Sequence, residues 1–377
     1  MRICLKAAIV LLLVVPAAAA DLKPLDPSVA QAGENDERLW YDIQLLTIEG
    51  QGFADTKATY DRLPARAEGV VREAVWNLSR SSSGIAVRFV TDATTLHVRW
   101  KLTSERLAMP HMPATGVSGL DLYVRDEQNT WRWLACTRPT KQEQTARIFA
   151  DIPAGTRNYL LYLPLYNGVE SIELGVASQT MLAPATPRPE GAEKPIVFYG
   201  TSITHGACAS RPGMVHTAIL GRRFDRPVIN WAFSGNGRME PEVVEFMAAI
   251  EAAAFVLDCL PNIGAEEVLA RTKPCVEILR AAHPETPILL VEDRSYADSF
   301  LVVGKRERNE TSRAALRQVY EELKAAGDEQ LFYLEGAHLL GDDNEATVDS
   351  SHPTDLGFMR QADAFAEVLE PIFLRSQ

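Results

Sequence analysis

A serine, an aspartate and a histidine are spaced in this sequence so that they could form a catalytic triad. Ser202 closely follows the apolar run 196–199, in the string Gly-Thr-Ser-Ile-Thr-His-Gly, where a strand would turn into a helix. Asp349 and His352 are three positions apart near the carboxyl end of the chain. At this spacing the carboxylate can hold the imidazole Nδ1–H and leave Nε2 to accept the serine proton. The three residues therefore predict attack by Ser202 on an acyl carbon.

Two further segments could stabilise the oxyanion that such an attack creates. Gly235 follows the apolar run 228–231 in the string Phe-Ser-Gly-Asn-Gly, and Asn262 follows the run 255–257. A glycine turn can expose a backbone N–H, and an asparagine side chain carries an amide donor. The backbone N–H of Ser202, at a helix start, is a third donor. The predicted oxyanion hole therefore consists of Ser202, Gly235 and Asn262.

Each of these segments has a simpler explanation when it is taken alone. A serine at a helix start is an ordinary N-cap, and Asn262 could cap a turn. His205 follows Ser202 by one helical turn and is a rival base, although no carboxylate is near it in the sequence. Ser234 is the next candidate for the nucleophile, and His111 could line the cleft from a loop.

A cation site could be formed by His338 with Asp342, Asp343 and Asn344. These residues lack the regular spacing of a calcium-binding loop, and an acidic, solvated loop explains them as well. The sequence has no Cys-x-x-Cys pair that would indicate a zinc or redox site. We therefore expect no metal and no cofactor.

The second half of the chain predicts the sheet that would bring the triad together. It contains five short, nearly continuous apolar runs, at 196–199, 228–231, 255–257, 288–291 and 331–334. Helical patterns occur at 240–252, 266–282, 309–326 and 355–374. Buried runs alternating with helices predict a three-layer α/β/α domain with a five-stranded, flavodoxin-like parallel sheet. Its functional residues should lie at the carboxyl ends of the strands.

The first half of the chain has a different periodicity. Apolar and polar residues alternate in short segments at 85–90, 96–100, 120–124, 159–163 and 172–176. Gly, Asn and Ser clusters separate these segments, which predicts an antiparallel, jelly-roll-like β-sandwich. Four prolines then stiffen residues 182–195. We therefore expect a sandwich over 21–181, a linker over 182–195 and the α/β domain over 196–377.

The first twenty residues have the pattern of a secretory signal. Arg2 and Lys6 precede the unbroken apolar run 7–15, and Ala18 and Ala20 suit a cleavage site before residue 21. The run is short for a membrane span, and no later segment is long and apolar enough for one. We expect a mature protein that is exported to the periplasm or beyond the cell and is not inserted in a membrane.

Composition limits the partners. With 46% hydrophobic and 23% charged residues the chain should fold, and its net charge of −12 disfavours nucleic acid as a partner. Export permits disulfides, and the cysteines after residue 20 allow three pairings among which the sequence does not choose: Cys136, Cys208, Cys259 and Cys275.

The order of these segments resembles the SGNH hydrolases, the superfamily of GDSL-like lipases and acylhydrolases. The strings at 199–213 and 349–357 are similar to one two-domain subfamily, and Gly-Leu-Asp-Leu-Tyr at 119–123 is similar to its N-terminal β-sandwich. The resemblance implies that Ser202 is the nucleophile, His352 the base and Asp349 its partner.

The sequence departs from the usual pattern of this superfamily at several positions. Thr201 stands where the first block usually has Asp, and Ala232 stands where second blocks often have Gly. In the third block, usually Gly-x-Asn-Asp, Leu260 and Ile263 replace the first and last residues. Because Leu260 and Ile263 replace two residues of this block, the match that supports Asn262 as an oxyanion donor is incomplete.

Together these observations predict an exported serine esterase that hydrolyses short acyl esters, with acetyl the expected group, on a small molecule or a glycan. Two alternatives remain open. The same residues could transfer an acyl group to a sugar hydroxyl, or the protein could bind carbohydrate without catalysis. The natural alcohol and the oligomeric state are not predicted.

Overall fold

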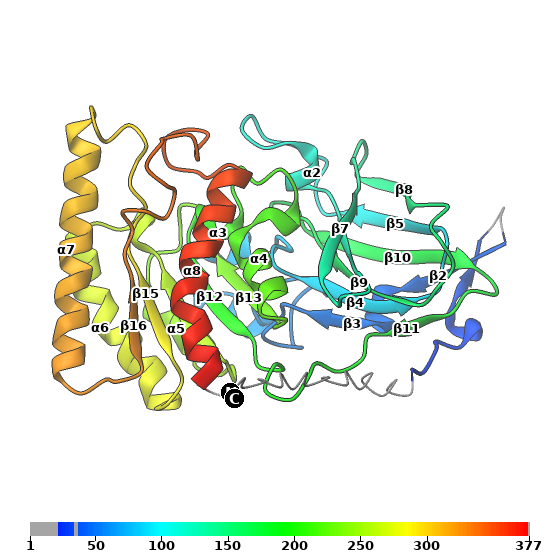
Figure 1. The fold of residues 1–377 in the computed structure, drawn as a ribbon, viewed down its shortest axis with the longest axis horizontal. Coiled ribbons are helices and arrows are strands. Elements are labelled where there is room, and N and C mark those ends of the chain that lie inside the picture. The colour runs from blue at the N-terminus through cyan, green and yellow to red at the C-terminus, as the bar shows by residue number, and fades with distance from the viewer. Residues whose placement is uncertain (1–21, 34–36, 376–377) are drawn as a thin grey trace, which may run out of the picture.

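The computed structural model of the protein describes residues 22–33 and 37–375. The predicted export signal, residues 1–20, lies outside the described residues. Within the described part, no helix combines the length and apolarity that crossing a bilayer requires. The chain forms an α/β half and a β-sandwich half, which lie next to each other (Figure 1).

The α/β half is built on the predicted parallel sheet. Its five strands run in the order β13-β12-β14-β15-β16, so the first strand in the chain lies between the second and third, as in flavodoxin-like sheets. Their bounds are β12 Ile196–Gly200, β13 Val228–Ala232, β14 Ala254–Asp258, β15 Ile288–Val291 and β16 Leu331–Leu334.

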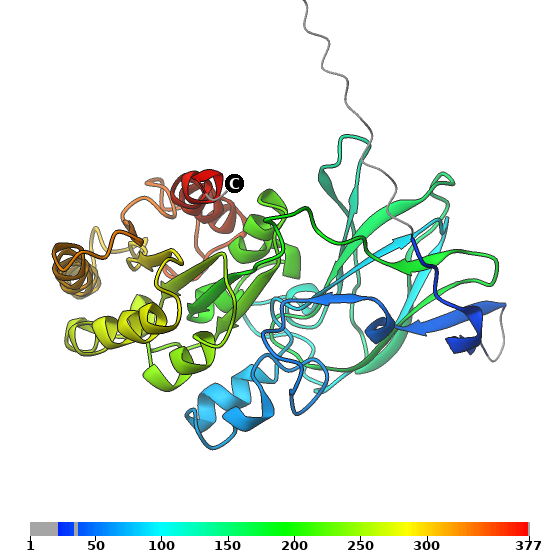
Figure 2. The ribbon, with the colours of Figure 1, turned by 90° about the horizontal axis from the view of Figure 1, so that it is seen from below.

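Helices cover both faces of this sheet, because its strands are apolar on both sides. Along β12, Val197 and Tyr199 pack into one core and Ile196 and Phe198 into the other. One face carries α5 Pro241–Met247, α6 Ala265–Ala282 and α7 Val303–Ala325, and the other carries α3 Ser202–His205, α4 His216–Arg223 and α8 Asp355–Arg375. Figure 2 shows α8, in red, across the sheet from α5 and α6. The predicted three-layer fold is confirmed.

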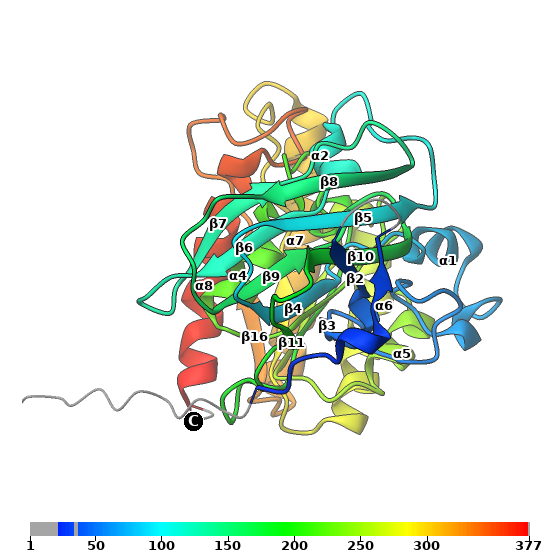
Figure 3. The ribbon, with the colours of Figure 1, turned by 90° about the vertical axis from the view of Figure 1, so that its right-hand side faces the viewer.

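The first half is the predicted antiparallel sandwich (Figure 3). One sheet is formed by β1 Gln31–Ala32, β2 Arg38–Asp42, β10 Val169–Ala177, β5 Leu96–Leu102 and β8 Glu143–Phe149. The other is formed by β11 Leu182–Pro184, β4 Ala86–Thr91, β9 Arg157–Tyr162, β6 Asp121–Arg125 and β7 Trp131–Cys136, with β3 Thr47–Glu49 beside β4. Buried and partly exposed residues alternate along β5, as the sequence pattern predicts.

Short helices connect these elements. Two are α-helical, α1 Glu73–Ser79 and α2 Ala114–Val117. The others are 3₁₀ turns: η1 Pro27–Val29, η2 Ile43–Leu45, η3 Ala65–Ala67, η4 Pro212–Met214 and η5 Leu260–Asn262. The sequence patterns did not indicate α4, and α7 begins at Val303 instead of residue 309.

The predicted linker differs from the structure at its start. Residues 182–184 form β11, which pairs with β4 of the sandwich, and residues 185–195 contain no helix or strand. Pro184 is tolerated because β11 is an edge strand, where one side of the backbone needs no ladder partner.

The two halves share a core. Apolar side chains of the segment 63–76, which precedes the sandwich strand β4, pack into the α/β half with Trp231. Arg62, fully buried, donates to the carbonyl oxygens of Asn230 and Ala232 at 2.8 and 2.7 Å. These carbonyls belong to β13, an edge strand, so Arg62 occupies acceptors that would otherwise lie open at the sheet edge.

The four cysteines in the described part of the chain are free thiols, so the structure contains none of the three possible disulfide pairings there. Cys208, Cys259 and Cys275 are buried. Burial raises the pKa of Cys275 to about 12, which keeps this thiol protonated and unreactive.

A buried histidine should make folding sensitive to acid. His216 of α4 is fully buried against Phe358 and Phe365, and neither ring nitrogen has a hydrogen-bond partner among the described residues. Burial, aided by the charge of Arg294, holds the pKa of His216 well below its ordinary value. Below about pH 6.5, His216 is therefore protonated in the unfolded chain and stays neutral in the folded chain.

We expect the free energy of unfolding to fall by about 1.4 kcal/mol per pH unit below about pH 6.5 for this histidine alone. Above that pH the residue is neutral in both states and contributes no pH dependence. Denaturant titrations at pH 7.5 and 5.5 would measure this. His216→Leu should show a smaller loss between the two pH values, and the exposed control His338→Gln should match the wild type. Equal losses in His216→Leu and the wild type would exclude the effect.

Candidate active site

The fold fixes Ser202 at the carboxyl edge of the central sheet. Ser202 is the first residue of α3, immediately after β12, and its own N–H has no acceptor within that helix. Two residues later, the hydroxyl of Thr204 donates to Asp258 at 2.6 Å, at the end of the neighbouring strand β14. Arg294 pairs with the same buried carboxylate through two nitrogens. These contacts tie the short helix to the sheet, which fixes the direction of the serine.

The predicted triad residues lie in one hydrogen-bonded chain. The hydroxyl of Ser202 is 2.8 Å from Nε2 of His352, and Nδ1 of His352 is 2.7 Å from Oδ2 of Asp349. The backbone N–H groups of His352 and Ser351 both donate to Oδ1 of Asp349, at 2.8 and 3.1 Å. The loop therefore holds its own carboxylate, and that carboxylate orients the imidazole toward the serine.

The environment of Asp349 keeps this carboxylate ionised. Partial burial would raise the pKa of Asp349, but the hydrogen bonds from the backbone and ring of His352 outweigh burial and lower it. At neutral pH the carboxylate is therefore negative and can stabilise an imidazolium. About half of the side chain faces solvent, at 47% exposure.

This exposure limits the expected effect of removing the charge. Losing a fully buried triad carboxylate costs about 10⁴-fold in kcat, and solvent screening of Asp349 should reduce the cost to about ten- to a hundredfold. We expect Asp349→Asn to lower kcat by that factor with acetyl esters. Asp342→Asn, on the exposed part of the same connection, is the matched control and should keep wild-type rates. Full activity of Asp349→Asn would exclude Asp349 from the triad.

Gly235 lies in the turn that follows β13. Its φ of 68° is in the left-handed region, and a Cβ at this position would meet no atom within 4 Å, so its backbone borders open space. A Cβ on Gly237 would lie 1.8 Å from the carbonyl oxygen of Gly200, so only glycine allows this turn to approach the loop of Ser202. The backbone N–H of Phe233 also donates to that oxygen at 3.0 Å.

Asn262 ends the 3₁₀ turn η5, which follows β14. One N–H of its side-chain amide donates to the carbonyl oxygen of Gly237 at 3.2 Å, and the amide has a second N–H. This bond joins the turn after β14 to the turn after β13. The three predicted oxyanion residues thus belong to connected loops at the same edge of the sheet.

The rival histidine does not contact the serine hydroxyl. His205 is fully buried; its Nε2–H donates to the carbonyl oxygen of Leu165 at 2.8 Å, and its ring stacks on Tyr166. Burial and the nearby charge of Arg62 hold the pKa of His205 well below its ordinary value. Packing therefore explains this residue better than catalysis does.

The sandwich half reaches the site through two loops. His111, between β5 and β6, has its ring centroid 6.3 Å from that of His352. Tyr166, between β9 and β10, donates from its hydroxyl to the carbonyl oxygen of Ser202 at 3.3 Å. The sequence pattern suggested the place of His111 but gave no sign of Tyr166, because a tyrosine in a sandwich loop has no distinctive spacing.

In the acidic loop 338–344, the carboxylate of Asp343 is paired with an arginine. Both carboxylate oxygens of Asp343 accept hydrogen bonds from Arg360, at 2.7 Å each, and this side-chain pairing is the largest cause of its lowered pKa. In the described part of the chain, no group of three or more His, Cys, Asp or Glu residues is placed to hold a metal ion.

Comparison with known proteins identifies the family. The pattern of the GDSL-like lipase/acylhydrolase family matches residues 193–370, and that of the N-terminal domain of SGNH-hydrolase-type esterases matches residues 38–182. A crystal structure described as a GDSL-like lipase from Bacteroides ovatus has 30% sequence identity and a TM-score of 0.84, over 89% of this chain and 98% of that one. The chain belongs to the GDSL-like lipase/acylhydrolase family. This membership supports ester hydrolysis or acyl transfer.

More distant structures share the fold of this GDSL-like protein. A salicylyl-acyltransferase from a tetracycline biosynthetic pathway has 20% identity and a TM-score of 0.71, over 90% of this chain and 98% of that one. A family two carbohydrate esterase from Clostridium thermocellum, in complex with cellohexaose, has 16% identity and a TM-score of 0.55, over 78% and 94%. A comparison with curated proteins found no match.

Proposed function

We propose that the protein is a serine esterase that removes short acyl groups, acetyl above all, from a carbohydrate alcohol. The hydrogen-bonded chain from Ser202 through His352 to Asp349 is the observation that carries this proposal. Membership of the GDSL-like family supports its general chemistry, and the contacts at the site support the roles of the individual residues.

In the proposed reaction His352 takes the proton of Ser202 as the serine oxygen attacks the ester carbon. Negative charge develops on the carbonyl oxygen, where the N–H groups of Ser202 and Gly235 and the amide of Asn262 would receive it. His352 then gives its proton to the departing alcohol, which leaves an acyl-enzyme. A water molecule, deprotonated by His352, attacks the acyl carbon and releases the acid together with free Ser202.

The surface beside the loop of Asp349 and His352, here called the catalytic loop, favours a short acyl group. The segment before α7 contacts this loop, with the N–H of Ala297 donating to the carbonyl oxygen of Ser350 at 2.9 Å. Its large apolar side chains are open to water, with Phe300 66% and Leu301 74% exposed. A chain lying on such a surface stays partly hydrated, so each CH₂ contributes well under the ~0.8 kcal/mol of full burial.

The carbohydrate part of the proposal rests on export and on likeness of fold. The signal-like start of the sequence supports a place in the periplasm or outside the cell, so the proposed alcohol is a carbohydrate of that location. A carbohydrate esterase shares the two-part fold. The contacts of His111 with His352 and of Tyr166 with Ser202 support a role for the sandwich in completing the cleft.

The test compares acyl groups and alcohols. We expect higher kcat/KM for acetyl than for octanoyl esters of the same alcohol, and release of acetate from an acetylated oligosaccharide. Chromatography of the products, with unacetylated sugar present as a possible acceptor, separates hydrolysis from acyl transfer. Ser202→Ala is the control for background hydrolysis. Faster cleavage of octanoyl esters would contradict the short-acyl proposal, and transfer to the added sugar in place of acetate release would show a transferase.

A further inference from the structure

The turn that carries Asn262 has few backbone hydrogen bonds of its own. η5 is a single 3₁₀ turn with two backbone hydrogen bonds: the N–H of Asn262 donates to the carbonyl oxygen of Cys259 at 3.1 Å, and the N–H of Ile263 donates to that of Leu260 at 3.2 Å. Pro261 in the middle of the turn has no N–H, and the buried side chain of Ile263 is apolar. Isolated 3₁₀ turns are weakly held by their own hydrogen bonds. Burial of Leu260 and Ile263 anchors the two ends of the turn, and the backbone between them depends also on contacts from outside the turn.

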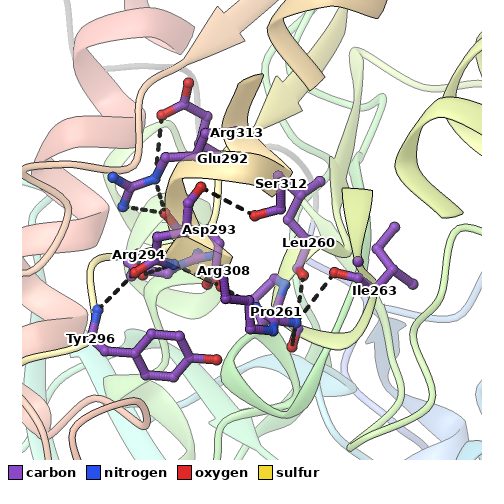
Figure 4. A network of polar contacts seen from close by, with 12 residues as sticks. Leu260, Pro261, Ile263, Glu292, Asp293, Arg294, Tyr296, Arg308, Ser312 and Arg313 are labelled. Carbon is purple, nitrogen blue, oxygen red and sulfur yellow. Dashed lines mark hydrogen bonds and ion pairs between the residues drawn. The ribbon is translucent and has the colours of Figure 1, made fainter. Parts of the chain in front are cut away.

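Arg308 of α7 supplies those contacts (Figure 4). Its Nη2 lies 2.9 Å from the carbonyl oxygen of Pro261, 3.2 Å from that of Ile263 and 3.4 Å from that of Leu260. These carbonyls flank Asn262 on both sides. A single guanidinium thus fixes the backbone that carries the donor, whereas the amide itself is bonded to Gly237.

A buried carboxylate holds the guanidinium in place. Nη1 of Arg308 donates to Oδ2 of Asp293 at 2.9 Å, and Asn309 donates to the same oxygen at 3.1 Å. The side chain of Asp293 is only 4% exposed, and the residue lies two positions after the end of β15. Arg313, on the same helix, instead donates to the backbone oxygen of Asp293 and does not contact the Asn262 turn.

We propose that Arg308 is a positioning residue that holds the Asn262 turn so that the amide meets the developing oxyanion. This inference rests on the proposed role of Asn262. Arg308 itself does not touch the reacting atoms, so it should act on kcat and only through Asn262. A small displacement of a catalytic group can cost about a hundredfold in rate, and the bond between Asn262 and Gly237 should retain part of the alignment.

A double-mutant cycle distinguishes positioning from general stabilisation. We expect Arg308→Gln to lower kcat about tenfold with KM unchanged, and to change kcat less than about twofold in an Asn262→Ala background. Arg308→Lys, which keeps the charge beside Asp293, should recover part of the rate. Arg313→Gln is the matched control and should keep wild-type kcat. Melting temperatures of all variants show whether they are folded, and Arg308→Lys replaces Arg308→Gln in the cycle if the latter does not fold.

The outcomes separate the two proposals. If Asn262→Ala loses activity but Arg308→Gln does not, or if the two losses simply multiply, the role of Arg308 is overturned and the proposed function stands. If the wild type has no esterase activity, or if Asn262→Ala is fully active, the proposed oxyanion hole fails and this inference fails with it.

Discussion

Ser202→Ala should lower kcat for acetyl esters by at least about a thousandfold, because the loss of a triad nucleophile removes the covalent route entirely. Residual activity would come only from the oxyanion donors and the bound water. A fluorophosphonate should label the wild-type protein on the peptide that contains Ser202 and leave Ser202→Ala unlabelled. We expect the variant to keep the fold, because the substitution removes only a hydroxyl, and the contact of that hydroxyl is with His352.

Ser234→Ala is the matched control for this experiment. Ser234 lies in the turn after β13, next to Gly235. The Ser234→Ala variant should retain activity within about threefold, because Ser234 is not part of the hydrogen-bonded chain from Ser202 to Asp349. Substantial activity in Ser202→Ala with a loss in Ser234→Ala would move the nucleophile to Ser234.

The residues at the strand ends could be located from sequence because their signals are local. An apolar run buried on both faces shows where a parallel strand ends, and Ser202, Gly235 and Asn262 each follow such a run. Asp349 and His352 could be paired because their spacing alone allows the contact that the structure contains. The sheet order then places the segments of Ser202, Gly235 and Asn262 side by side at one edge, where His352 contacts Ser202.

The supporting contacts could not be found in this way, because they depend on packing between distant segments. Arg308 lies among many charged residues of α7, a pattern that usually indicates a solvated helix face. Arg62 precedes the sandwich strand β4 yet donates to β13 of the other half. The buried segment 63–76 likewise joins a core that forms mostly from residues beyond 195. Nothing in the local sequence marks these long-range partners.

The third block was the hardest to interpret from the sequence, because two of its residues differ from the usual pattern. Leu260 and Ile263 are both buried in the core beside α6, so they serve packing and not the chemistry of the turn. Their main-chain oxygens instead accept hydrogen bonds from Arg308. The third block therefore keeps Asn262, and hydrogen bonds from Arg308 of α7 support the backbone on both sides of it.

Asn262→Ala should lower kcat about a hundred- to a thousandfold with little change in KM, the usual cost of removing one oxyanion donor. The reason is that the amide meets full negative charge only in the transition state, whereas the ground-state ester carbonyl binds it weakly. Steady-state rates with acetyl esters measure this. Asn262→Asp, which keeps the shape of the side chain but replaces the donor with an acceptor and a negative charge, should be at least as inactive. A loss confined to KM in Asn262→Ala would instead make Asn262 a substrate-binding residue, and full activity in Asn262→Asp would show that no donor is needed there.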